Sequence, residues 1–400
     1  MGRWAAITNQ CGIIFSTLLN RINTNVKSSH TYRVHEIRAL INDTLFFRSL
    51  LSFLINSKHG SVISFNAIPF LSLYVVESQK YLISIDPTIR EALEESLGFN
   101  FKEFIETSRN RIKLFEENSG IEEIALRFDN IVKSQKEAFN REHTGLLGWL
   151  KRLLQDDIGI YVFNDNVINT THTVVYNLGL ESYTSNSQIS QLMLSVSQDI
   201  GKYTETLFQA FVIGHNGEYQ EFFQQDTQKQ IRSIDRKSDR YYPLIFKNPE
   251  ARELNALLTL LFPMTNFLAF GLSQITSRKS ETAFKLKFVG LYHIIHSLSN
   301  LQDYYYNSTV LSTDSKHFLK VILSSKEVKL IKKKQLLRNI LVHYEIRGIP
   351  EAVLDETKPF SGIVEHLFNG ATFDEVETII DEQLARVGSV LQEWSSYPIK

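Results

Sequence analysis

Apolar residues recur along most of this chain three or four positions apart, and this spacing constrains the possible folds more than any other feature. In the segment 32–56, for example, isoleucines, leucines and Phe47 fall on a single face of a helix. The same spacing recurs at 100–117, 121–140, 144–155, 251–275, 279–306, 314–345 (with a break near Ser324) and 373–394. The chain is therefore predicted to be mostly α-helical.

Two short polar motifs mark the expected starts of helices. Asp86 has the side chain of an N-cap, and Pro87 suits the first position of the helix that would follow. Thr372 and Glu375 have the spacing of a capping box, in which each side chain bonds the backbone N–H of the other residue. This box predicts the start of the helix at 373–394.

Two segments depart from the helical pattern. The segment 158–181 is rich in β-branched, aromatic and turn-forming residues, which predicts either a short β-hairpin or a long ordered loop. The segment 225–250 is charged and ends at a proline, so we interpret it as a linker or an exposed loop.

A chain of 400 residues exceeds what one hydrophobic core usually supports, so two or three domains are expected. Residues 1–183 are predicted to form an N-terminal helical domain with a sensing or regulatory role. Residues 184–250 are predicted to contain a connecting helix and the charged linker. Residues 251–400 are predicted to form a helical bundle. Below, residues 1–183 are called the N-terminal half and residues 251–400 the C-terminal bundle.

The composition excludes some classes of function. The formal net charge is −1, so any nucleic-acid site must be a local basic patch. The single cysteine, Cys11, rules out an intramolecular disulfide and a cysteine-based zinc site. The glycine-rich phosphate loop, the H-E-x-x-H zinc motif and the G-x-S-x-G elbow do not occur in the sequence. We therefore expect no cofactor and no catalytic metal.

His293 and His296 lie one helical turn apart and could share a metal ion, but no third ligand follows at a recognisable spacing. Both residues border the main apolar stripe of the helix predicted at 279–306. Packed or interfacial histidines are the favoured interpretation, and one of them could instead assist a site elsewhere.

The sequence offers one candidate for a membrane span, the segment 254–277, which carries no charged residue. Polar or helix-breaking residues interrupt it at Asn255, Pro263, Asn266 and Gln274, so a buried helix is expected instead. The first residues make a poor signal peptide. We expect a cytoplasmic protein that does not enter a membrane.

The stretch LLRNILVHYE at 336–345 combines a leucine-rich helical face with Arg338, Asn339 and His343. Asn339 and His343 are four residues apart and therefore neighbours on a helix, and the long side chain of Arg338 can reach toward them. A histidine can act as acid or base near neutral pH, and an arginine can stabilise a phosphorane. Asn339 could hold the imidazole tautomer or bind a phosphate oxygen. These residue types suit metal-independent cleavage of RNA by its 2′-hydroxyl.

The densest basic run of the chain directly precedes this stretch. Its lysines, Lys329, Lys332, Lys333 and Lys334, are predicted to bind the phosphate backbone of RNA.

The arrangement Arg338-Asn339-x-x-x-His343, late in an α-helical bundle, resembles the R-x4–6-H motif of ribonucleases in the HEPN (higher eukaryotes and prokaryotes nucleotide-binding) superfamily. The resemblance covers about residues 250–400. It implies a homodimer in which two motifs face each other, metal-independent endoribonuclease activity, and a role as a toxin or in abortive defence against phage. An antitoxin or a phage-derived trigger is then an expected partner. The segment 254–277 and the flank of His293 and His296 are the expected dimer surface.

Three alternatives remain open at this point. The polar residues of 338–343 could line a solvated helix edge without any catalytic role. The bundle could be a non-catalytic module for dimerisation or nucleotide binding. It could also belong to an antitoxin or adaptor that holds RNA without cutting it.

Overall fold

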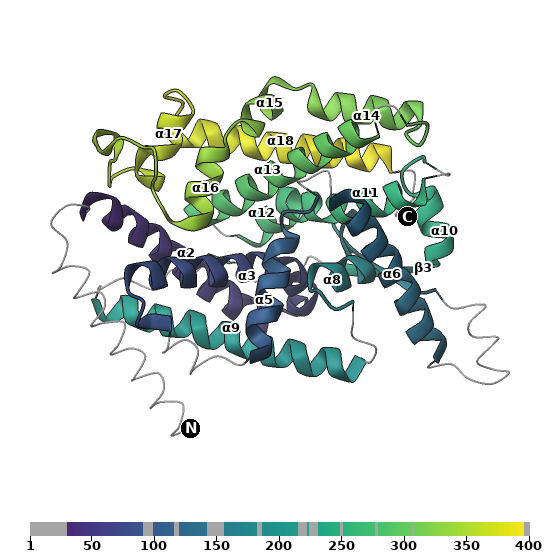
Figure 1. The fold of residues 1–400 in the computed structure, drawn as a ribbon, viewed down its shortest axis with the longest axis horizontal. Coiled ribbons are helices and arrows are strands. Elements are labelled where there is room, and N and C mark those ends of the chain that lie inside the picture. Colours follow the sequence, from purple (N-terminus) through teal and green to yellow (C-terminus); the bar gives the residue numbers. More distant parts are fainter. Residues whose placement is uncertain are drawn as a thin grey trace.

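The computed structural model describes residues 30–90, 99–115, 120–141, 156–181, 186–214, 222–223, 231–248, 251–276, 279–305 and 308–395. Within these residues the fold is mostly α-helical with one small sheet, as the apolar spacing predicted (Figure 1). The helix predicted at 144–155 lies outside the described residues. So does most of the helix predicted after Asp86, although the Asp86 Oδ1 accepts a hydrogen bond from the Thr88 backbone N–H, 2.9 Å away.

Helices α2, α3, α5 and α9 pack against one another in the lower part of the view, whereas α6 packs against α8 (Thr171–Asn177) and α11 (Arg252–Asn266) (Figure 1). The predicted helices at 32–56 and 121–140 are confirmed, and the helix predicted at 100–117 is confirmed as far as Arg111. The elements of this region are α2 (His30–Asn56), α3 (Gly60–Ile85), α5 (Phe99–Arg111), α6 (Gly120–Arg141) and α9 (Asn186–Gly214).

The C-terminal bundle forms a second layer over helices α2, α3, α5 and α9 (Figure 1). Its predicted helices are confirmed, and the segment 314–345 breaks near Ser324 as predicted, where Ser324 ends one helix and Ser325 caps the next. A second break, which was not predicted, separates the helix that ends at Lys332 from the one that begins at Gln335. Thr372 and Glu375 form the predicted capping box. The elements are α11 (Arg252–Asn266), η1 (Phe267–Gly271), α12 (Leu272–Ile275), α13 (Glu281–Tyr304), α14 (Thr313–Leu323), α15 (Lys326–Lys332), α16 (Gln335–His343), η2 (Glu351–Val353), η3 (Pro359–Gly362), α17 (Ile363–Leu367) and α18 (Phe373–Trp394).

A three-stranded antiparallel sheet has the strand order β2-β1-β3. Strands β1 (Ile158–Phe163) and β2 (Asn166–Thr170) form the hairpin that was one of the two predicted alternatives for 158–181, and α8 (Thr171–Asn177) follows directly. The prediction of a linker or exposed loop at 225–250 was wrong for its described part. That part contributes strand β3 (Ile231–Arg236), which pairs with β1, and α10 (Ser238–Leu244).

Among the residues that the structure describes, two helices are long and apolar enough to span a membrane, Gly60–Ile85 and Arg252–Ile275, and each has 78% of its most apolar window buried inside the fold. Helix α11 lies between the layers and contacts β2, α6, α13 and α18. The segment 254–277 is therefore a buried helix, as expected, because its apolar side chains fill the core of its own chain. Because this segment is buried within its own chain, the expectation that it forms a dimer surface was wrong.

A buried polar network joins α2 to the C-terminal bundle. One oxygen of Asp43 accepts from the Lys285 ammonium at 2.5 Å and from the Tyr344 hydroxyl at 2.6 Å. The other oxygen accepts from the Thr282 hydroxyl at 2.7 Å. Asp43 and Lys285 are almost fully buried, so each charge depends on the other for its compensation. The network fixes α13 and the residue that ends α16 relative to α2.

The Asp43→Ala variant should lose about 3–5 kcal/mol of unfolding free energy, because the Lys285 ammonium would stay buried without a counter-ion. Urea denaturation at neutral pH measures this loss. The double variant Asp43→Ala/Lys285→Met removes both charges and should recover most of it. Equal losses in the two variants would show that the ion pair does not stabilise the contact between α2 and the C-terminal bundle.

Candidate active site

Helix α16 carries the Arg-Asn-His motif and packs against α13 on one side and α3 on the other. Leu337, Ile340 and Leu341 are buried, as expected of a leucine-rich helical face. Leu336 begins the same stretch but is exposed, while Val342 is buried. The difference arises because two neighbouring helices, rather than one, cover α16.

The helix ends at His343 because Tyr344 adopts a left-handed backbone conformation with φ 59°. A residue with a side chain rarely adopts this conformation, so surrounding contacts must hold it. The Tyr344 hydroxyl bonds Asp43, and its ring lies 4.2 Å from the Lys285 ammonium. The buried network thereby places His343 at the last position of the helix.

The Arg338 guanidinium contacts two polar groups. Its Nη1 donates to the Asn339 side-chain oxygen at 3.0 Å, and its Nη2 lies 3.5 Å from the His293 Nε2. Since a guanidinium can only donate, the His293 Nε2 must accept in this contact. His293 is buried on α13, which agrees with the interpretation of a packed histidine. His293 is therefore a polar neighbour of the motif that comes from an earlier helix.

His343 pairs with a carboxylate from the N-terminal half. Its Nδ1 lies 2.6 Å from the Glu77 Oε2, across 266 positions of sequence. The suggestion that Asn339 holds the imidazole tautomer was therefore wrong, because Glu77 occupies that role and Asn339 binds Arg338. The His343 side chain is 38% exposed, so solvent and a substrate can reach it.

Glu77 lies in α3 and is only 2% exposed. Its Oε1 accepts from the Arg109 guanidinium and lies 3.7 Å from the Lys80 ammonium. Burial alone would raise the pKa of Glu77. The hydrogen bond from His343 and the charges of Arg109, His343 and Lys80 outweigh burial and lower that pKa to about 2. Glu77 is thus an anion throughout the ordinary pH range.

Sequence reasoning did not identify Glu77 or Arg109. One signal was present, because Glu77 and Lys80 are the only charged residues in an otherwise apolar helix of 26 residues. A buried carboxylate in such a helix requires a partner. The identity of that partner depended on the packing of α3 against α16, which no local pattern reveals.

The lysine run does not form one continuous track on the surface. The Lys332 ammonium donates to the Ser299 hydroxyl at 2.6 Å. The Lys334 ammonium bonds the Leu367 carbonyl and lies 4.7 Å from the centre of the Phe368 ring, and burial lowers its pKa. Lys329, Lys332 and Lys333 are exposed, and Lys334 is half-buried. Only Lys329 and Lys333 have no internal contact among the described residues.

His293 and His296 face different partners. His293 contacts Arg338, whereas the His296 Nε2 lies 3.2 Å from the Lys332 carbonyl oxygen and its ring stacks on Tyr292. Within the described parts of the chain, no group of three or more histidine, cysteine, aspartate or glutamate side chains is placed to hold a metal ion.

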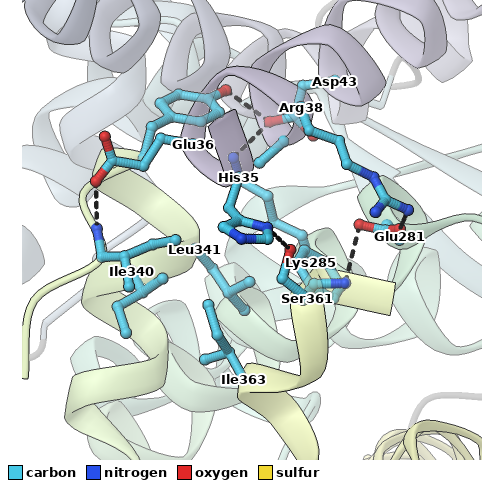
Figure 2. Close-up of a pocket in the computed structure, with 14 residues that line it drawn as sticks. His35, Glu36, Arg38, Asp43, Glu281, Lys285, Ile340, Leu341, Ser361 and Ile363 are labelled. Atoms are coloured by element: carbon cyan, nitrogen blue, oxygen red, sulfur yellow. Dashed lines mark hydrogen bonds and ion pairs between the residues drawn. The ribbon is translucent and has the colours of Figure 1, made fainter. Parts of the chain in front are cut away.

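A small cavity lies beneath the buried face of α16, between α2, α13 and η3 (Figure 2). Its polar groups bond one another: the His35 Nδ1 lies 2.6 Å from the Ser361 hydroxyl, and Glu36 accepts from the Ile346 backbone N–H at 2.8 Å. The volume of about 30 Å³ suits one or two water molecules rather than a substrate. The cavity therefore belongs to the joint between the layers, and the candidate active site lies around His343.

No protein-family model, curated protein or solved structure matches this chain.

Proposed function

We propose that this chain is a metal-independent endoribonuclease of the HEPN type, with His343 as its acid–base group and Arg338 as the cation that stabilises the transition state. The observation that carries the proposal is the pairing of the His343 Nδ1 with an ionised, buried carboxylate. This contact leaves the Nε2 of a solvent-reachable imidazole for proton transfer. Arg338 and Asn339 lie on the same short helix.

The proposed reaction is a transesterification. The Nε2 of His343 takes the proton of an RNA 2′-hydroxyl, and the 2′-oxygen forms a bond to the adjacent phosphorus. The bond from phosphorus to the 5′-oxygen then breaks, and that oxygen receives a proton. The products are a 2′,3′-cyclic phosphate and a 5′-hydroxyl. Arg338 offers charged N–H donors to the phosphorane oxygens, and its bond to Asn339 restricts the plane of the guanidinium.

A homodimer would supply the second proton-transfer group. One chain offers His343 near solvent, whereas its other histidine close to Arg338, His293, is buried. We therefore propose that two copies of α16 face each other, so that the partner's His343 protonates the leaving oxygen. The exposed surface of α15 and α16, with Lys329, Lys333 and Leu336, is the proposed meeting face.

The biological setting proposed for this activity is the cytoplasm, where the protein would act as a toxin or phage-defence effector on cellular or phage RNA. An antitoxin or a phage-derived trigger would control it. The resemblance of Arg338-Asn339-x-x-x-His343 to HEPN ribonucleases supports this setting.

The purified protein should cleave RNA in the presence of EDTA and leave 2′,3′-cyclic phosphate and 5′-hydroxyl ends. The His343→Ala variant should lose at least about 100-fold in rate, because it lacks the proton-transfer group. Gel analysis of end-labelled RNA measures both results. Strict dependence on Mg²⁺ or Mn²⁺ would refute the proposed chemistry.

Mixing the wild type with the His343→Ala variant tests whether two chains build one site. Adding excess His343→Ala protein to the wild type should form mixed dimers and depress the rate below that of the wild type alone. A monomer in light scattering that cleaves RNA at the full rate would exclude the two-chain site.

The Arg338→Lys variant should keep RNA binding within about threefold and lose about 100-fold or more in kcat. Lysine retains the charge but cannot contact Asn339 and a phosphorane oxygen with the same rigid fork. Single-turnover kinetics and equilibrium binding separate the two effects. Parallel losses in affinity and rate would assign Arg338 to ground-state binding alone.

Lys329 and Lys333, the lysines of the run without a described internal contact, should account for most of the salt dependence that the run contributes. The Lys329→Gln/Lys333→Gln variant should reduce the slope of log affinity against log salt by about 1.4, the value expected for two lost contacts to single-stranded RNA. Fluorescence anisotropy measures this slope. The Lys332→Gln/Lys334→Gln variant removes the same charge from internally bonded positions and should change the slope much less. Equal changes in the two variants would show that the run acts only through its net charge.

A further inference from the structure

We propose that Glu77 is the positioning residue for His343, so that the N-terminal half completes the active site of the C-terminal bundle. This inference rests on the proposed function, and it assigns to α3 and α5 a direct part in the reaction. It also assigns the catalytic nitrogen of His343.

The geometry fixes the tautomer of His343. An ionised carboxylate can only accept hydrogen bonds, so the imidazole nitrogen 2.6 Å from Glu77 must carry a proton. In the neutral imidazole the lone pair therefore lies on Nε2, which has no partner among the described residues. The carboxylate also stabilises the imidazolium that forms once Nε2 has taken a proton from the substrate.

Arg109 fixes the carboxylate itself. The Arg109 guanidinium bonds the Glu77 Oε1, while the Oε2 bonds His343, so both oxygens are held and the carboxylate cannot rotate freely. Arg109 comes from α5 and is 11% exposed, and Glu77 is 2% exposed. Water therefore has little access to replace either contact. The order of contacts from Arg109 through Glu77 to His343 links three helices.

The competing explanation is a purely structural ion pair between α3, α5 and α16. A structural pair would set the same tautomer of His343, because the contact is the same, but its loss would affect only stability or the fraction of folded protein. It would leave kcat per folded molecule unchanged. The two explanations thus differ in measurable ways.

The first test compares the Glu77→Gln variant with the wild type across pH. The variant should lose at least about 10-fold in kcat with little change in KM, because it aligns the imidazole poorly. The loss should persist at each pH when the rate is normalised to folded protein. The matched control is Glu36→Gln, which changes a half-buried carboxylate of α2 that bonds Tyr81 and the Ile346 backbone but not His343. It should keep the wild-type profile.

The second test does not depend on activity. In protein with ¹⁵N-labelled histidines, NMR should show His343 protonated on Nδ1 in the wild type and a substantial Nε2–H population in Glu77→Gln. The His343→Asn variant assigns the signal. Because Glu77→Gln leaves the Arg109 charge uncompensated, the double variant Glu77→Gln/Arg109→Met provides a second protein with a neutral pair.

A kcat per folded molecule that is unchanged in both variants would overturn the positioning role. A wild-type protein that cleaves no RNA, yet shows the Nδ1–H tautomer and loses it in the variants, would refute the proposed function while the orientation of His343 by Glu77 stands.

Discussion

The buried ion pair between Asp43 and Lys285 is the contact on which the placement of the candidate site depends. Two opposite charges in an apolar interior tolerate little displacement, because either one alone would be severely destabilising. Such a pair specifies an arrangement more than it adds stability. Here it aligns α2 with α13, and through the Tyr344 hydroxyl it sets where α16 stops. The register of α16 against α3 follows from that alignment.

Helix α16 distributes its polar residues between two neighbours. Arg338 is oriented toward His293 of α13, and His343 is oriented toward Glu77 of α3. The cation and the imidazole are therefore positioned by different layers of the fold. A shift of one layer against the other would change their separation, so the rigid joint around Asp43 matters for the geometry of the site as well as for folding.

Local patterns predicted most of the helices because many of them bury one apolar stripe, and the polar breaks near Ser324 and at Thr372 are encoded within a few residues. Helix α3 was not predicted, because it is buried over most of its surface and its apolar residues form no single stripe. Strand β3 was missed because its exposed charges, such as Arg232 and Asp235, hide the pairing with β1. The partner of His343 was missed for a different reason: the i,i+4 neighbour Asn339 is visible in sequence, whereas Glu77 is brought near only by tertiary packing. The same holds for Lys332 and Lys334, whose internal acceptors belong to other helices.

The long separation between Glu77 and His343 has a consequence for how the protein is made. Translation proceeds from the N-terminus, so Glu77 and Arg109 emerge from the ribosome well before His343, which follows Glu77 by 266 residues. Until α16 emerges and docks, the carboxylate has no imidazole to orient. A nascent chain, or one truncated before α16, therefore contains half of the candidate site and lacks the imidazole that we propose as its acid–base group. Biosynthesis itself delays the assembly of this centre until the two layers can close on each other.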